Sequence, residues 1–176
     1  MSTHRSASAA DTQPTSQSLT ITRVFDAPRA LVFQAWTEPA RLVQWFGPRG
    51  FTTHSCTMDV RPGGTWRLCM RRPDGVEHWL HGVYREVIAP ERLVSTWVWE
   101  RGATDFDDWV PGGIADHESE LTVTLEEREG RTALTLHHTR FESAGARHSH
   151  HDGWTEALDR LAESVNGGSR SSQQMS

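Results

Sequence analysis

The residues best suited to acid–base or metal chemistry are the histidines, of which the chain has ten. Three of them, His148, His150 and His151, precede the last apolar segment, and Asp152 follows directly. On a helix, His148 and His151 would share one face close to a carboxylate oxygen, as a metal site requires. This His-x-His-His spacing matches no known zinc motif, and a solvated helix start explains it equally well. We therefore expect no metal ion and no cofactor.

Two histidines have positions suited to a binding site. His138 follows Leu134 and Leu136 at the spacing that directs alternate strand residues inward. His151 falls on the helical face that carries Trp154. Either imidazole could orient the polar end of a ligand or exchange a proton near neutral pH, and either could equally be a hydrogen-bonded residue at the rim of the core. Since no Ser-His-Asp or Cys-His arrangement is legible, we assign no catalytic residue and lean against an enzyme.

Bulky apolar side chains, including several of the eight tryptophans, fall on the predicted inward faces. We predict that they line a ligand pocket together with the two histidines; filling of a solid core is the alternative. Arg67 and Glu77 are further candidates to orient a polar ligand group. The predicted pocket residues are Trp66, Leu68, Met70, Tyr84, Trp97, Trp99, Leu136, His138, His151, Trp154 and Leu158.

A long amphipathic helix must support one wall of such a pocket. Trp154, Leu158, Leu161 and Val165 recur at the spacing of one helical face, which predicts a helix over 149–165. Ser149 followed by Asp152 resembles a capping box, and Asn166-Gly167-Gly168 is a typical helix stop. This helix needs an apolar surface to cover, and the longer segments before it are typical of strands.

Alternating apolar residues between turn signals predict seven strands, and short connections favour antiparallel pairing. Two short helices, from Pro28 to Trp36 and from Pro39 to Phe46, should follow the first strand. The fold class is therefore α+β: a curved seven-stranded antiparallel sheet with the long C-terminal helix over its concave face. The predicted strands cover residues 19–25, 51–60, 64–71, 76–88, 92–100, 118–127 and 131–139.

The remaining segments are two tails and one long connection. Residues 1–18 and 167–176 are polar and are predicted to be disordered, which leaves one domain over 19–166. The connection from Gly102 to Asp116 is unusually long and contains Phe106, Trp109 and Ile114. It could be a lid over the mouth of the pocket or a plain surface loop.

Composition excludes several classes of partner. The net charge is −5, and ten acidic residues face two basic ones between Glu100 and Glu129, so binding to nucleic acid is not expected. No apolar run is long enough to span a membrane and no secretory signal is present, which predicts a cytoplasmic protein. The more consistent hairpin register points Cys56 and Cys69 apart, so we expect free thiols. The oligomeric state is left open.

Several short motifs, in order, resemble a known family: the bacterial homologues of the activator of the heat-shock protein 90 ATPase, in the START-like, SRPBCC or Bet v 1 superfamily. The resemblance covers residues 19–166. Its motifs are Phe25-Asp26-Ala27-Pro28, Trp36-Thr37-Glu38-Pro39, Trp45-Phe46-Gly47-Pro48, Asp59-Val60-Arg61-Pro62-Gly63-Gly64-Thr65-Trp66, His81-Gly82-Val83-Tyr84, Pro90-Glu91-Arg92-Leu93 and Gly153-Trp154.

This resemblance implies the helix-grip fold, with a cavity between sheet and long helix that holds apolar small molecules in related proteins. It also implies a link to chaperones and the stress response. Our leading hypothesis is a non-catalytic binder of a small apolar molecule, aromatic or lipid-like. The second is a co-chaperone-like interaction module that uses the outer sheet face or the segment from Trp45 to Pro48. The third is an enzyme of the cyclase or hydrolase type.

Overall fold

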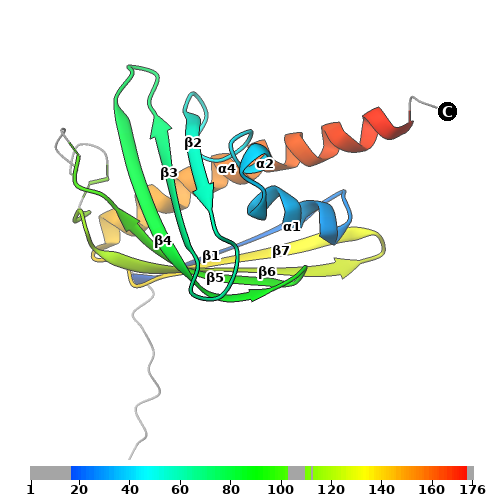
Figure 1. The fold of residues 1–176 in the computed structure, drawn as a ribbon, viewed down its shortest axis with the longest axis horizontal. Helices are drawn as coiled ribbons and strands as arrows, with labels where there is room; N and C mark the ends of the chain where they lie inside the picture. The colour runs from blue at the N-terminus through cyan, green and yellow to red at the C-terminus, as the bar shows by residue number, and fades with distance from the viewer. Residues whose placement is uncertain (1–16, 103–109, 112, 174–176) are drawn as a thin grey trace, which may run out of the picture.

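The computed structural model describes residues 17–102, 110–111 and 113–173 and has the predicted α+β architecture (Figure 1). Each predicted strand is present, with ends that differ from the prediction by at most two residues. In chain order the elements are β1 (Leu19–Phe25), α1 (Arg29–Thr37), α2 (Pro39–Leu42), β2 (Thr52–Met58), β3 (Thr65–Arg71), β4 (Glu77–Ile88), β5 (Arg92–Trp99), β6 (Glu118–Arg128), β7 (Arg131–Thr139) and α4 (Ala144–Gln173).

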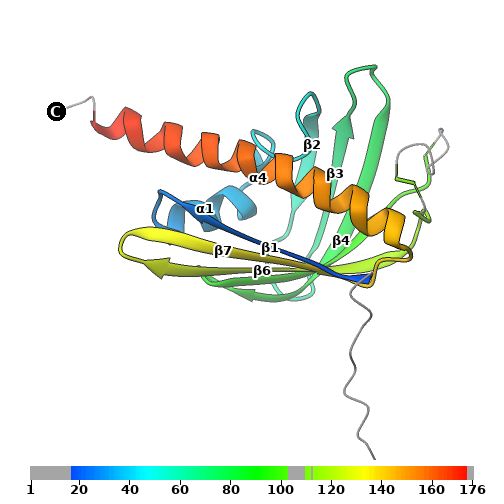
Figure 2. The ribbon, with the colours of Figure 1, turned by 180° about the vertical axis from the view of Figure 1, so that it is seen from behind.

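The strands form one antiparallel sheet in the order β1-β7-β6-β5-β4-β3-β2. Neighbours along the chain are neighbours in the sheet from β2 to β7, through short connections except for the long one between β5 and β6, and β1 joins the edge at β7. Alternate residues of β6 and β7 are buried, as expected for a sheet with one covered face. The sheet curves around α4, which lies across its concave side with α1 and α2 close by (Figures 1 and 2).

The long helix begins and ends elsewhere than predicted. Ser143 caps it, since the Ala146 amide donates to Ser143 Oγ at 3.0 Å, and Ser149 lies inside the helix. The predicted stop at Asn166-Gly167-Gly168 is also wrong, because α4 continues to Gln173. A glycine costs only about 1 kcal/mol within a helix, so it weakens the helix there without ending it. The predicted buried face is confirmed: Trp154, Leu158, Leu161 and Val165 are buried.

The second predicted helix is confirmed only in part. Regular helix ends at Leu42, and hydrogen-bonded turns carry the chain to Phe46, whose amide donates to the Leu42 carbonyl at 3.0 Å. Gly47 then adopts a φ of 99°, which favours glycine. We call the segment from Phe46 to Pro48 the elbow. It turns the chain from the helices toward β2.

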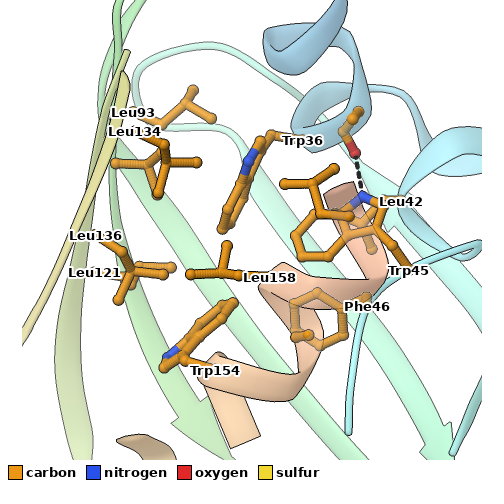
Figure 3. Packing of buried hydrophobic residues seen from close by; sticks show 14 of the residues in the cluster. Trp36, Leu42, Trp45, Phe46, Leu93, Leu121, Leu134, Leu136, Trp154 and Leu158 are labelled. Atoms are coloured by element: carbon orange, nitrogen blue, oxygen red, sulfur yellow. Dashed lines mark hydrogen bonds between the residues drawn. The ribbon is translucent and has the colours of Figure 1, made fainter. Parts of the chain in front are cut away.

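Aromatic side chains pack the helices against one another and against the sheet. Trp36 and Trp45 meet edge to face with ring centroids 4.7 Å apart, and Trp36 also packs against Trp154 at 5.8 Å. The indole of Trp45 is completely buried and donates to the Ala35 carbonyl at 3.0 Å. In Figure 3, Leu158 lies between the sheet leucines and Phe46, with Trp154 below it. This half of the interior is mostly filled by side chains.

The two cysteines are free, as predicted. Cys69 pairs with Ser55 and Cys56 with Leu68, so the thiols belong to neighbouring ladder positions on opposite faces of the sheet. Trp66 pairs with Met58, which places apolar residues together on the inner face. Within the part of the chain that the structure describes, no helix is both long and apolar enough to cross a bilayer.

Candidate functional site

A cavity of about 240 Å³ lies between the elbow, strands β3 and β5, and the first half of α4. Its walls are largely apolar: Phe46 and Pro48 on one side, Met70, Trp97 and Trp99 from the sheet, and Trp154 and Ala157 from α4. Gly153 also lines it, and a Cβ there would meet only Pro48 Cγ, at 3.7 Å. The absence of a side chain at position 153 therefore helps to keep the space open.

A second, smaller cavity of about 40 Å³ lies deeper against the sheet. Trp66, Leu68, Tyr84, Trp36 and Met58 are among its walls. Phe46 and Trp97 line both cavities, so their rings separate the two spaces.

The structure distributes the predicted pocket residues among three environments. Met70, Trp97, Trp99 and Trp154 line the larger cavity. Trp66, Leu68 and Tyr84 line the smaller one with Trp97. The other four, Leu136, His138, Leu158 and His151, line neither cavity.

The structure places these four residues away from the two cavity walls. Leu136, Leu158 and His138 are fully buried in the core behind the cavity walls. His151 is nearly half exposed, with 47% of its side-chain surface accessible, and it lies beside Asp152. The buried face of α4 includes Ala146, Trp154 and Leu158, which are eight and then four residues apart. His150, four residues before Trp154, falls on that face and takes the place predicted for His151.

His138 holds the tryptophans in position. Its Nδ1 accepts from Trp154 Nε1 at 3.1 Å, so the ring proton is on Nε2, which donates to Ser119 Oγ at 2.8 Å. Ser119 in turn donates to the Trp97 carbonyl at 3.3 Å. Burial lowers the pKa of His138 well below its ordinary value, which keeps the imidazole neutral.

His150 holds Trp99 in position in the same way. Its Nε2 accepts from Trp99 Nε1 at 2.9 Å, so Nδ1 carries the proton and donates to the Ala146 carbonyl at 2.7 Å. Burial lowers the pKa of His150 as well. In both histidines each ring nitrogen has a protein partner. Neither imidazole has a nitrogen left to bind a ligand or to accept a proton from one.

Among the described tryptophans two buried donors have no partner: Trp36 Nε1 and, at the centre of the aromatic cluster, Trp97 Nε1. Trp97 is 4% exposed, and its Nε1 has no hydrogen-bond partner among the described residues. The neighbouring Trp66, in contrast, donates to Ser95 Oγ at 2.6 Å. An unsatisfied buried N–H costs about 1–3 kcal/mol. Trp97 lines both cavities, but its Nε1 is buried, so a ligand acceptor could reach it only if the neighbouring side chains shift.

The hydroxyl of Tyr84 adds a polar group to the wall of the smaller cavity. Tyr84 is 4% exposed, and burial raises the pKa of its hydroxyl, so this group stays neutral.

The predicted orienting residues Arg67 and Glu77 belong to the opposite, outer face of the sheet. Arg67 forms two hydrogen bonds of 2.9 Å with Glu100 and stacks 3.9 Å above the ring of Trp79. Glu77 accepts from Arg71 at 2.8 Å. They do not line the cavity between sheet and helix, because strand alternation directs them away from α4, and they border instead a separate hollow of about 160 Å³ with Trp79 and Glu100.

Arg160 is a site residue that the sequence analysis missed. Its Nη1 donates to the carbonyls of Gly47 at 2.9 Å and Pro48 at 3.2 Å, and so ties the elbow to α4. The rim of the cavity is acidic: Asp152 and Glu156 are exposed there, and Glu156 accepts from the Arg49 amide at 3.1 Å. In the sequence, the position of Arg160 next to the apolar face of the helix was the one sign that it has a structural role.

The long connection contributes one described residue to the cavity, the buried Val110. Phe106 and Trp109, two of the three residues predicted for a lid, lie outside the described residues. Ile114, the third, is 60% exposed and lines neither cavity. The choice between a lid and a surface loop therefore stays open.

Solved structures with the same fold come from several bacteria. A protein from Nitrosomonas europaea is 23% identical with a TM-score of 0.71, over 90% of this chain and 99% of that one. A protein from Chromobacterium violaceum is 25% identical with a TM-score of 0.70, over 85% and 96%. The AHSA1 protein from Silicibacter pomeroyi is 24% identical with a TM-score of 0.70, over 85% and 97%. No curated protein matches the sequence.

A sequence-family model described as "Activator of Hsp90 ATPase homolog 1-like protein" matches residues 26–166. This match covers most of the chain, and the resemblance noted in the sequence is thereby confirmed. The seven-stranded curved sheet and the long C-terminal helix agree with it. The chain belongs to the family of proteins like the activator of Hsp90 ATPase homolog 1 and has its START-like, helix-grip fold.

Proposed function

We propose that this protein binds one small, neutral, apolar molecule, aromatic or lipid-like, in the larger cavity, and that it does so in the cytoplasm. The observation that carries the proposal is the cavity itself, about 240 Å³ with mainly apolar walls. An engineered apolar cavity of roughly 150 Å³ in another protein suffices to bind benzene. Enclosing apolar surface is favourable by about 25 cal/mol per Å². One or two fused rings, or a short alkyl chain, suit this space.

The polar groups around the cavity narrow the chemistry of the ligand. The unpartnered Trp97 Nε1 favours a ligand with a hydrogen-bond acceptor, such as a carbonyl oxygen. Asp152 and Glu156 at the rim disfavour an anion by like-charge repulsion. A neutral aromatic ketone has both required features.

The histidines favour a binding role over catalysis. A general base needs a free nitrogen within hydrogen-bond reach of its substrate. His138 and His150 each use both ring nitrogens for protein partners. Their contacts support a function in fixing the cavity walls, which gives the cyclase or hydrolase hypothesis less support.

A co-chaperone-like role is the second candidate, and the description of the family favours it. The elbow is poorly suited to docking, because Phe46 and the preceding Trp45 are buried. The outer face of the sheet is the alternative surface. Capture of an Hsp90-type chaperone that persists in a variant with a filled cavity would favour this role.

The proposal is tested by calorimetric titration with 1-acetylnaphthalene, a neutral two-ring ketone. Gly153→Leu should lower its affinity by more than about tenfold, because the new side chain enters the cavity beside Pro48. Thr155→Leu is the matched control, since Thr155 is on the same helix and does not line the cavity.

Binding by the wild-type protein and Thr155→Leu, with weak binding by Gly153→Leu, is the expected result. Equal affinity in all three proteins would place the ligand elsewhere and overturn the proposal. Failure of the wild-type protein to bind this ketone and its alkyl analogue 1-ethylnaphthalene would also count against it.

A further inference from the structure

Three potential metal ligands meet on the outer face of the sheet, on the opposite side from the cavity. They are His54 on β2, Cys69 on β3 and Glu77 on β4. One ligand atom from each lies within 4.8 Å of the other two. The three strands are neighbours in the sheet, so backbone hydrogen bonds fix their relative positions.

A β-bulge places His54 in this group. Thr53 is buried on the inner face and pairs with Met70, whereas the next pair along the ladder is Ser55 with Cys69. The irregularity between Thr53 and Ser55 thus inserts His54 as an extra residue opposite Cys69. Bulges commonly redirect a side chain in this way. Without the bulge, the strand would not place residues 54 and 55 together beside Cys69.

Strand register positions the other two ligands. Arg71 pairs with Glu77, and Cys69 is two residues before Arg71 on the same face. Glu77 is therefore the diagonal neighbour of Cys69, within reach of a longer side chain. Arg71 donates to Glu77 Oε1 at 2.8 Å and fixes the carboxylate.

The geometry suits a small tetrahedral cation. His54 Nε2 and Glu77 Oε1 are 3.4 Å apart. With bonds of about 2.0–2.1 Å to nitrogen and oxygen, the edge of a tetrahedron is about 3.3 Å. Imidazole, thiolate and carboxylate are the usual zinc donors, and three protein ligands leave one position for water. We infer that His54, Cys69 and Glu77 form a binding site for a divalent ion of the zinc type.

Charge and proton balance are consistent with this site. The Cys69 thiol is buried, its pKa is raised to about 11, and it shares a hydrogen bond with Glu77. A divalent ion would replace the thiol proton, which leaves to the solvent; S⁻ and the Glu77 carboxylate would offset the two charges of the ion, and Arg71 would leave the cluster with one positive charge. Metal affinity should therefore increase with pH. Arg71 would remain as the partner that orients Glu77.

The test is titration of untagged, full-length, reduced protein with Co²⁺, which reports thiolate ligation by a near-ultraviolet charge-transfer band. We expect one equivalent to bind and Zn²⁺ to displace it. Cys69→Ser should abolish the band. Cys56→Ser, the matched control on the inner face, should retain it. His54→Gln and Glu77→Gln should each weaken binding by more than about tenfold.

A missing band in the wild-type protein, or a band that survives Cys69→Ser, would overturn the inference. Cys69 is buried, so its variant could fail to fold, which circular dichroism would reveal. In that case the two glutamine variants decide, since His54 and Glu77 are exposed. Unchanged Co²⁺ affinity in both would refute the site.

Discussion

At the scale of single residues, the interior tryptophans differ in their hydrogen bonding. Trp66, Trp99 and Trp154 each donate to a side chain, whereas Trp97 Nε1 has no partner among the described residues. The Trp97 ring packs against Phe46, with centroids 5.8 Å apart, and against Trp154 at 5.3 Å. It is thus held in place by packing, and its Nε1 is buried beside the two cavities that the ring lines.

Trp97→Phe should separate the contribution of this donor from that of the ring. We expect the affinity for 1-acetylnaphthalene to fall about fivefold, which corresponds to one neutral hydrogen bond of about 1 kcal/mol. The affinity for 1-ethylnaphthalene, which lacks the acceptor, should change by a smaller factor. Calorimetry of both ligands on both proteins measures this difference. Equal losses for the two ligands would show that Trp97 acts only through its ring.

Three histidines with lowered pKa values, His78, His138 and His150, should make stability depend on pH. Their pKa values are lowered in the folded protein, whereas in the unfolded chain they return to about 6.5. The unfolded state therefore takes up more protons below pH 6.5, and the free energy of unfolding should fall as pH falls, by up to about 1.4 kcal/mol per pH unit for each histidine. Above pH 7 this contribution is fully present.

Urea unfolding between pH 7.5 and 5.5 measures this dependence. His138→Gln removes one of the three histidines with a lowered pKa and should reduce the slope of stability against pH, even though the variant is less stable overall. His148→Gln is the control, since His148 is exposed. An unchanged slope in His138→Gln would contradict the assignment of a neutral, buried imidazole.

At the scale of elements, the cavity depends on the attachment of the elbow to α4. Arg160 supplies this attachment through the carbonyls of Phe46, Gly47 and Pro48. These groups are more than 110 residues away along the chain, so no local pattern reveals the contact. The guanidinium is partly buried, and its pKa is lowered by that burial.

Arg160→Met keeps the apolar stem and removes these hydrogen bonds. We expect a loss of about 2 kcal/mol in the free energy of unfolding, because hydrogen bonds to charged groups contribute about 1.5–3 kcal/mol. Ligand affinity should also fall, since the elbow forms one cavity wall. Arg49→Met, which breaks an exposed ion pair with Glu163, is the control and should have little effect. Equal stability of the two variants, measured by urea unfolding, would refute the role of Arg160.

At the scale of the whole molecule, the sequence predicted the sheet better than the site. Periodicity predicted the strands closely, because burial on one face imposes alternation. Helix ends depend on weaker local signals, so Ser149 was mistaken for a cap in place of Ser143. His150 lines the cavity in place of the predicted His151. The two positions differ by one residue along α4, and the sequence pattern does not define the orientation of the helix about its axis that closely.

Other site residues could not be predicted because they depend on packing between distant segments. The elbow meets α4 only in the folded chain. Gly153 contributes to the cavity because it has no side chain beside Pro48. Alternation on β3 and β4 could have assigned Arg67 and Glu77 to the outer face, since they share it with Cys69 and Arg71. What no pattern reveals is whether an interior lined by so many large rings is filled or hollow.

A crystal structure of the protein with 1-acetylnaphthalene tests the central claim most directly. We expect the two rings to lie between Met70 and Gly153, with the ketone oxygen about 2.9 Å from Trp97 Nε1. An empty cavity in crystals saturated with the ligand, or a ligand bound only on the outer face of the sheet, would contradict the account.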